Sequence, residues 1–350
     1  MRRVKLFASP FLIAAALLYG VTPASAQRPM RINMGTVAPE GSPWHEVLQR
    51  MGQDWRRISG GKINIRIFPG GVLGSEAEML RKMRIGQLQA VGLSGAGLER
   101  VDSGVACLQI PMMIDSYEEL DYIREKIAPK LEVLLEQKGY IVLNWSDVGW
   151  VHFFTKQPAR TPDDIRKMKL FTSAGDPETE KLYKEFGFRP VPLDLTDMLL
   201  GLQTGMIDAF DVPPLFAMLD QTFGLAKNMI DVKWAPLVGA TIINRRTWQR
   251  IPPEWRAEMH RSARKAGLDL RGKIRKLGDD AVVEMQKRGL KVVRLDRAGV
   301  ALWQAEAEAA YPKLRGGLVP EDLFDEVLRL RNEFRASQGQ SSRGATTSER

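Results

Sequence analysis

The sequence predicts an α/β protein whose two lobes form a clamshell. Apolar stretches of strand length alternate with amphipathic stretches of helical length, first over residues 31–145 and again over residues 151–210. The chain has 350 residues, which is long for one core when domains usually contain ~100–200 residues. A long helical segment from residue 253 is expected to link the two lobes.

The first series of elements predicts a parallel sheet covered by helices. A strand over residues 31–36 is followed by Ser42, which is placed to cap a helix that runs to about residue 59 and has Pro43 at its first position. Polar and apolar residues then alternate over 62–68, as in a strand with one buried face. Further helices are expected at 75–85 and 117–137, and further strands at 90–94 and 140–145.

The second series repeats the alternation in shorter elements. Strands are expected at 151–154, 169–171, 189–192 and 207–210, and helices at 177–186 and 196–203. The apolar run 237–243 is long enough to pair with either sheet. The helix over 253–287 contains Gly267, Gly272 and Gly278, each of which disfavours an unbroken helix by ~1 kcal/mol relative to Ala.

The ends of the chain predict export and a tail. Residues 1–5 are basic, residues 6–19 are mostly apolar, and small residues precede Gln27. This pattern is typical of a secretory signal peptide, here residues 1–26, because the apolar run is shorter than the ~20 residues that span a bilayer. We therefore expect a periplasmic protein that does not span the membrane once residues 1–26 are removed. Residues 336–350 are rich in Ser, Gln, Gly and Thr and are expected to be disordered.

The remaining chain divides into two discontinuous lobes. Lobe I is expected to contain residues 27–148 and about 237–255. Lobe II is expected to contain residues 149–236 and, with the C-terminal helices, about 256–335.

Charge and cysteine content exclude several classes of protein. The net charge is +9, of which Arg2, Arg3 and Lys5 contribute three, so removal of the signal peptide leaves +6. The other basic residues are mixed with acidic ones, which indicates a solvated surface, and a nucleic-acid partner is not expected for an exported protein. The single cysteine, Cys107, lies in an apolar run and is expected to be buried, and it leaves no internal disulfide or thiolate metal site.

No pattern in the sequence indicates catalysis. His45, His152 and His260 are far apart and have no metal-type partner three or four residues away. The glycine-rich stretch 68–74 lacks the Lys and Ser/Thr of a phosphate loop, and no nucleophile elbow or dinucleotide motif is present. We therefore expect no catalytic residue, no metal site and no cofactor, and a secreted α/β enzyme is the weaker hypothesis.

A series of short motifs carries a resemblance to a known family. The segments are Ala-Pro-Glu-Gly-Ser-Pro at 38–43, the strand and turn at 61–74, Arg-Ile-Gly-Gln-Leu-Gln at 84–89, Gln-Ile-Pro-Met at 109–112 and Gly-Leu-Gln-Thr-Gly-Met-Ile-Asp-Ala at 201–209. In this order the chain resembles the solute-binding proteins of tripartite ATP-independent periplasmic (TRAP) transporters, of the DctP type. The resemblance implies a periplasmic-binding-protein clamshell that captures a small organic ligand between its lobes and delivers it to membrane permease subunits.

Three positions depart from the family pattern. Phe171 occupies the place where the family usually has an Arg that clamps the ligand carboxylate. Val151 aligns with a second Arg, and Val212 with a commonly occurring Asn. Because a bound carboxylate needs charge-assisted donors, we expect a ligand that is more apolar than a dicarboxylate.

The ligand-binding residues follow from this interpretation. Lys169 could replace the lost guanidinium if the strand register slips, and Asp211 could pair with His152 in an enzyme. A ligand-sensing or interaction subunit without a transport role is another alternative. The expected ligand-binding residues are Trp44, Trp145, Trp150, Val151, Phe153, Lys169, Phe171, Phe210, Asp211 and Val212.

Overall fold

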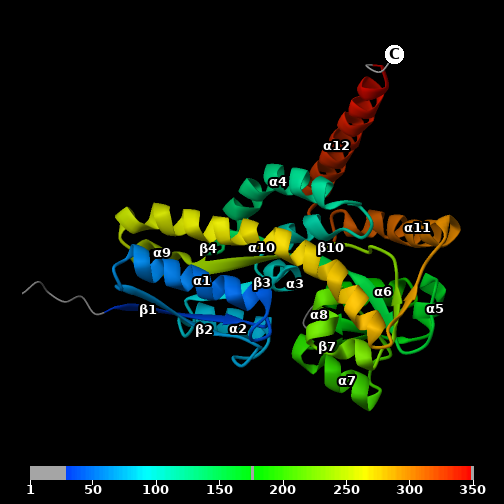
Figure 1. Cartoon of the computed structure of the whole chain (residues 1–350), viewed down its shortest axis with the longest axis horizontal. Coiled ribbons are helices and arrows are strands. Elements are labelled where there is room, and N and C mark those ends of the chain that lie inside the picture. The colour runs from blue at the N-terminus through cyan, green and yellow to red at the C-terminus, as the bar shows by residue number, and fades with distance from the viewer. Residues whose placement is uncertain (1–28, 175–176, 348–350) are drawn as a thin grey trace, which may run out of the picture.

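Two mixed β-sheets, each covered by helices, form the two lobes of the molecule (Figure 1). The computed structural model describes residues 29–174 and 177–347, with side chains to residue 338, so the predicted signal peptide (1–26) lies outside the described residues. The prediction of a two-lobed α/β fold is confirmed.

Lobe I is built on a five-stranded sheet. Its strands, in spatial order, are β2 (Ile63–Phe68), β1 (Met30–Thr36), β3 (Ala90–Ser94), β10 (Pro236–Asn244) and β4 (Tyr140–Trp150). The strands β1, β2 and β3 are parallel, whereas β10 runs antiparallel to both β3 and β4. The apolar run that the sequence left open to either sheet therefore belongs to lobe I.

Helices α1 (Pro43–Ile58), α2 (Glu76–Arg84), α3 (Gly95–Glu99), α4 (Tyr117–Gln137) and α9 (Arg245–Arg250) belong to this lobe. Helix α1 begins as the sequence predicts, because the Ser42 hydroxyl accepts a hydrogen bond from the His45 backbone N–H at 3.3 Å. The predicted apolar face of this helix is buried and consists of Trp44, Val47, Leu48, Met51 and Trp55.

Lobe II is built on a six-stranded sheet with shorter strands. Their spatial order is β11 (Lys291–Val293), β9 (Asn228–Ile230), β5 (His152–Thr155), β8 (Ala209–Val212), β6 (Lys169–Ser173) and β7 (Arg189–Leu193). The covering helices are α5 (Pro162–Arg166), α6 (Pro177–Glu185), α7 (Met198–Thr204) and α8 (Pro214–Leu219). Strand β8 begins two residues later than the sequence predicts, and β9 and β11 were not predicted.

The long helix α10 (Pro253–Lys287) joins the lobes. It crosses the molecule from α1 and β4 in lobe I to α8 in lobe II, as Figure 1 shows. The helix is continuous through its three glycines, and one of them permits close packing. A Cβ on Gly267 would lie 2.6 Å from the Trp145 carbonyl oxygen and 2.8 Å from the Asn144 Cβ, so only glycine lets α10 approach β4 this closely.

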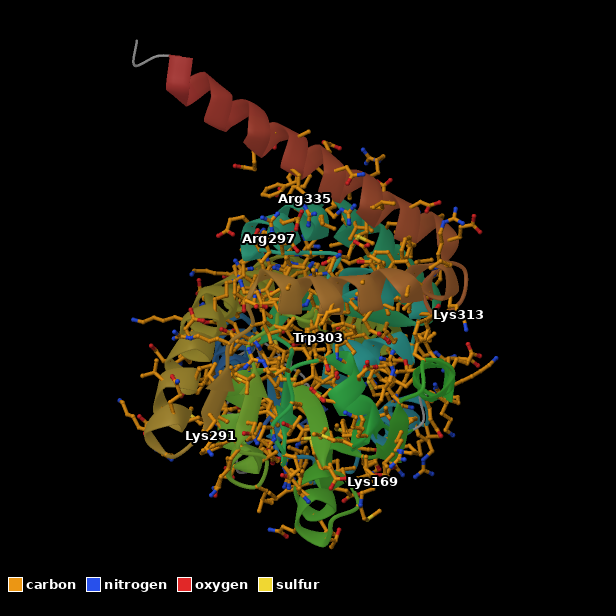
Figure 2. All side chains as sticks on the ribbon, turned by 90° about the vertical axis from the view of Figure 1, so that its right-hand side faces the viewer. Lys169, Lys291, Arg297, Trp303, Lys313 and Arg335 are labelled. Atoms are coloured by element: carbon orange, nitrogen blue, oxygen red, sulfur yellow. The ribbon has the colours of Figure 1, made fainter. Side chains whose placement is uncertain are left out.

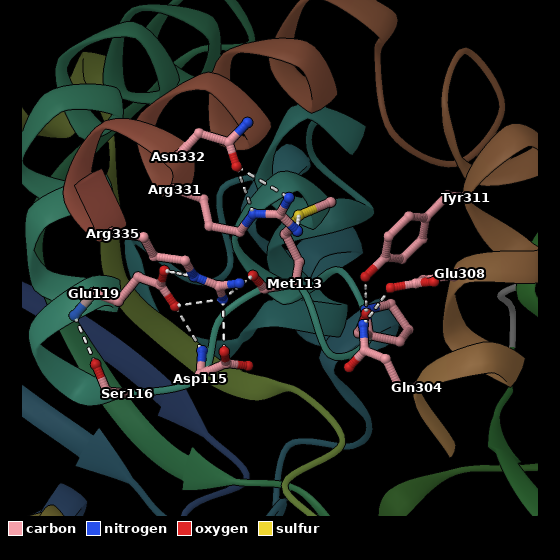
Figure 3. Close-up of polar contacts among 11 residues, drawn as sticks. Met113, Asp115, Ser116, Glu119, Gln304, Glu308, Tyr311, Arg331, Asn332 and Arg335 are labelled. Carbon is pink, nitrogen blue, oxygen red and sulfur yellow. Dashed lines mark hydrogen bonds and ion pairs between the residues drawn. The ribbon is translucent and has the colours of Figure 1, made fainter. Parts of the chain in front are cut away.

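The C-terminal helices divide between the lobes. Helix α11 (Arg297–Leu314) packs on α5 of lobe II, whereas α12 (Glu321–Thr347) packs on α4 of lobe I. The Arg335 guanidinium bonds Glu119 and Asp115, each at 2.7 Å (Figure 3). The assignment of residues 256–335 to lobe II therefore does not describe α12, which the apolar residues Leu323, Phe324, Val327 and Leu330 attach to the lobe I core.

Helix α12 also extends beyond the packed region. Disorder was expected over residues 336–350, but the helix continues to Thr347. Adding a residue to a helix that is already nucleated is much easier than starting one, so composition alone does not mark where this helix ends.

Two further predictions concern single features. Cys107 is fully buried in the core of lobe I, as expected. Within the described part of the chain, no helix combines the length and apolarity of a membrane span.

Candidate functional site

A cavity of about 280 Å³ lies between the two lobes. It is open at the carboxyl ends of strands from both sheets, where ligands of α/β proteins usually bind. These strand ends supply Thr36 of β1, Ser94 of β3, Ser173 of β6 and Val212 of β8. Helix α1 contributes Trp44 to the lobe I wall.

A second cavity of about 240 Å³ extends the first toward α11. The two share wall residues from both lobes, among them Val151, Tyr183, Asp211 and Leu237. Together they form one continuous cleft, large enough for a small organic molecule.

Five of the predicted ligand-binding residues line this cleft: Trp44, Val151, Phe171, Asp211 and Val212. The Trp44 indole N–H donates to the Asp147 carbonyl oxygen at 3.1 Å, which fixes the ring in the lobe I wall. Phe171 and Val212 belong to the apolar core of lobe II and present part of their surface to the cavity. The three residues that the sequence analysis aligned with polar anchors, Val151, Phe171 and Val212, thus line one cavity as apolar side chains.

The other five predicted residues lie away from the cleft. Phe210 stacks on Phe154 at a centroid distance of 5.2 Å, and Phe153 packs against Trp303 at 4.8 Å, so both belong to the lobe II core. Strand alternation explains the position of Phe210, because neighbours such as Phe210 and Asp211 face opposite sides of a sheet. Phe153 pairs with Asp211 across the strands and shares its face, but Trp303 of α11 covers it.

Trp145, Trp150 and Lys169 are also directed elsewhere. Trp145 donates its indole N–H to Glu132 at 3.1 Å, and the ring of Trp150 packs on Tyr117 at 5.5 Å. The Lys169 side chain is 46% exposed and bonds the Gly205 carbonyl. It lies near the lower edge of the view in Figure 2, far from the buried Trp303 of α11.

Several polar wall residues were not predicted. Asn144 Nδ2 and Thr172 Oγ1 have no hydrogen-bond partner among the described residues, although both residues are more than nine-tenths buried. Glu76 accepts from the Ser94 backbone N–H at 2.6 Å and from its hydroxyl at 2.8 Å. No sequence signal separates these residues from ordinary turn and strand residues, because their role depends on the meeting of two lobes.

The cleft contains carboxyl groups but, among its described wall residues, no Lys, Arg or His. Asp211 projects from the end of β8, and burial raises the pKa of its carboxyl to about 7. Burial also raises the pKa of Glu76, although its bonds to Ser94 oppose the shift. The site is therefore poor in groups that would neutralise an anion.

His152 does not complete a catalytic pair with Asp211. Its Nδ1 lies 3.3 Å from the Ile230 carbonyl oxygen, and burial lowers its pKa. His152 is absent from the described walls of the cleft, whereas Asp211 belongs to them. Within the described residues there is also no group of three or more His, Cys, Asp or Glu side chains that could hold a metal ion.

Two further contacts join lobe I to lobe II. The Arg100 guanidinium of lobe I donates to the Ala174 carbonyl of lobe II. Gly71, with φ of +69°, lies so close to Thr196 that an added Cβ would be 2.8 Å from its methyl carbon. The lobes are thus in contact around the cavity, and a side chain at position 71 would hold them apart.

The connections behind the cleft are hydrogen-bonded to each other. The Val151 N–H donates to the Ala235 carbonyl at 2.8 Å, and the Trp234 N–H donates to the Val151 carbonyl at 3.0 Å. These paired segments join β4 to β5 and β9 to β10, so the chain passes between the lobes twice at one short region.

A buried ion network holds α10 on lobe I beside this region. Asp147 pairs with Arg124 at 2.5 Å and with Arg275 of α10 at 2.8 Å, and Arg275 also pairs with Asp121 at 2.7 Å. Arg124 and Asp147 are each about 1% exposed. Because Asp147 also anchors Trp44, the network fixes one wall of the cavity relative to the linking helix.

Comparisons with known proteins agree with this architecture. The chain is 26% identical over 246 residues to the 2,3-diketo-L-gulonate-binding periplasmic protein YiaO of Escherichia coli (strain K12). The matched region covers 68% of this chain and 73% of that protein. It is similar in fold to a TRAP periplasmic solute binding protein from Xanthobacter autotrophicus Py2 with bound β-D-galacturonate (TM-score 0.79, 20% identity, 86% of this chain and 99% of that one).

A further structure has the same fold. The sugar acid binding protein DctPAm from Advenella mimigardefordensis strain DPN7T, in complex with galactonate, matches with a TM-score of 0.81 and 16% identity over 87% of this chain and 99% of that one. A sequence profile of the bacterial extracellular solute-binding protein family 7, DctP, matches residues 34–316. The chain therefore belongs to this family of solute-binding proteins.

Proposed function

We propose that the protein is the periplasmic solute-binding subunit of a TRAP-type transporter and that it captures a small organic ligand in the cleft between its lobes. The single observation that carries this proposal is the cavity of about 280 Å³ whose walls come from the strand ends of both lobes. A ligand there touches both lobes and stabilises their closed arrangement, which a membrane permease can recognise. Residues 1–26 direct export of the chain.

The ligand in this proposal is more apolar than a dicarboxylate and is not a sugar acid. The similar proteins from Xanthobacter and Advenella hold galacturonate and galactonate, each of which carries a carboxylate. In this chain Phe171, Val151 and Val212 occupy the expected anchor positions, and the described walls contain no basic side chain. A buried carboxylate without charged donors is strongly disfavoured.

A thermal-shift screen of the purified protein tests capture. The compounds are neutral, cationic and anionic organic molecules small enough for the cleft. A ligand that binds only the folded state stabilises it by about 2.7 kcal/mol at a concentration of 100 times Kd. We expect hits among compounds with an apolar body, and a preference for succinate or galacturonate would contradict the proposed ligand class.

Two measurements separate a carrier from an enzyme and from a sensor. Mass spectrometry of the hit after incubation with the protein should recover it unchanged, whereas a new product would indicate catalysis. Deletion of the gene should abolish cellular uptake of the hit, whereas normal uptake would support a sensing role without transport.

A further inference from the structure

The carboxyl groups of the cleft differ in whether other side chains of the protein bind them. Glu76 is bonded by Ser94, and Glu306 pairs with Arg166 at 2.6 Å. Glu99 accepts from the Gln109 side-chain amide at 2.5 Å. Asp211 has no hydrogen bond or ion pair with another side chain among the described residues, although it belongs to the walls of both cavities.

Isolation of a half-buried carboxyl group is energetically unfavourable. Burial raises the pKa of Asp211 to about 7, and no cation in the described walls opposes this shift. A positive charge beside the carboxylate would reverse the effect, because an opposite charge within ~4–6 Å favours the ionised form. The lobe II wall thus has an acceptor for which the described residues supply no donor except the backbone N–H of Asp211 itself.

Two unpartnered atoms lie in the walls of the same cavity. Among the described residues, Asn144 Nδ2 of β4 has no acceptor and Thr172 Oγ1 of β6 has no partner of either kind. Buried polar atoms without a partner are rare in folded proteins, and each calls for an explanation. Because both atoms lie in the walls of the cavity that also contains Asp211, a polar molecule between the lobes would supply the missing partners.

We propose that the ligand is a small organic cation, with a protonated amine or amidinium group that binds Asp211 and an apolar body that packs on Trp44, Phe171 and Phe216. This inference rests on the proposed function and adds the sign of the ligand's charge. The nitrogen donates charge-assisted hydrogen bonds to the Asp211 carboxylate. The apolar walls take up the rest of the molecule, and Asn144 and Thr172 bind a polar substituent on it.

Titration calorimetry at pH 8 with charge-matched probes tests the proposal. Each set contains an amine, an alcohol and a carboxylate on one skeleton, such as 2-phenylethylamine, 2-phenylethanol and phenylacetate, with parallel sets on cyclohexyl and butyl skeletons. D-galacturonate and succinate are included as anions of the kind that relatives bind. We expect the amine of at least one set to bind tenfold or more tightly than its alcohol, and no carboxylate to bind.

The variant Asp211→Asn removes the charge with little change in shape. It should weaken amine binding at least tenfold and leave alcohol binding nearly unchanged. Asp220→Asn is the matched control, because burial also raises the pKa of Asp220, to about 6, but this residue lies at the end of α8 outside the described walls. It should leave amine binding unchanged.

A second variant keeps the proposal testable if Asp211→Asn fails to fold. Phe171→Arg places a guanidinium in the wall of the cavity that Asp211 also lines, and it should abolish amine binding while it creates binding of galacturonate. Tighter binding of the carboxylate than of the amine by the unmodified protein would overturn the inference and leave the solute-binding function intact. Failure of every probe, of either charge, would contradict both proposals.

Discussion

The two walls of the cavity differ in how their polar atoms are satisfied. In the lobe I wall, Thr36 Oγ1 accepts from the Ala38 N–H at 3.2 Å, Glu76 is bonded by Ser94, and the Trp44 indole bonds Asp147. In the lobe II wall, Thr172 Oγ1 has no partner among the described residues, and Asp211 is bonded only by its own backbone N–H. Lobe I has one comparable group, the side-chain amide of Asn144. We therefore expect the polar groups of lobe II to contribute more to ligand selection than those of lobe I.

The largest expected change is a loss of stability that distinguishes a core residue of lobe II from a residue of its cavity wall. Phe210→Ala empties a fully buried ring site and should lower the free energy of unfolding by about 4 kcal/mol. The matched variant Phe171→Ala removes a ring at the cavity and should lower stability less, while it changes ligand affinity. Urea unfolding measures both, and an equal loss from the two variants would contradict the assignment of Phe171 to the wall.

The second effect tests the rigidity of the lobe I wall. Asp147→Asn leaves Arg124 and Arg275 short of a carboxylate in a buried network and should lower the free energy of unfolding by about 3 kcal/mol. The control is Asp269→Asn, which breaks the exposed pair with Lys265 and should cost less than about 1 kcal/mol. A small loss from Asp147→Asn would show that the network does not hold this wall.

The third effect is the pH dependence that Asp211 confers. Burial raises the pKa of its folded-state carboxyl from 3.8 to about 7, so the folded state binds the proton more tightly than the unfolded state. Stability should therefore be highest below about pH 4 for this group and fall as pH rises to about 7, by at most about 1.4 kcal/mol per pH unit.

Asp211→Asn should remove this slope, as measured by urea unfolding at several pH values. The other titratable wall groups, Glu76, Glu99, Tyr183 and Glu306, are present in both proteins, so the difference between them isolates Asp211. An unchanged slope would indicate that the carboxyl group is well solvated.

The smallest expected change is in the free energy of unfolding of two Thr→Val variants, and it should have opposite signs for the two walls of the cavity. Thr172→Val removes a buried hydroxyl that has no partner and should raise the free energy of unfolding by about 1 kcal/mol, at the expense of ligand affinity. Thr36→Val removes the hydroxyl that accepts from the Ala38 N–H, and it should lower the free energy of unfolding by a similar amount. Destabilisation by both variants would mean that Thr172 is satisfied in the free protein.

The sequence was sufficient for most of the fold because local signals and burial agree there. Ser42 and Pro43 mark the start of α1, and the apolar spacing over 117–137 matches α4. The C-terminal helices were harder to place, since the division of α11 and α12 between lobes depends on contacts such as Arg335 with Glu119, more than 200 residues apart.

Only part of the candidate site could be predicted from the sequence. Motif alignment brought Val151, Phe171 and Val212 to one cavity, but composition could not tell a wall aromatic from a core aromatic. Phe210 faces away from Asp211 because of strand alternation, whereas Phe153 lies on the same face as Asp211 but is covered by Trp303 of α11. Strand β8 also begins two residues later than its apolar pattern predicts. Asn144 and Thr172 are distinguished only by the absence of a partner, which a sequence does not record.

The length of α10 has a consequence for how the two lobes can move. Its 35 residues make a rod of about 52 Å, held to lobe I through Arg275 and to lobe II through its contact with α8. Because the same helix is held to both lobes and contributes Leu270 to the cavity wall, rotation of one lobe against the other requires the helix to bend or to lose one of these contacts. The stiffness of this one helix therefore limits how far the cavity can open.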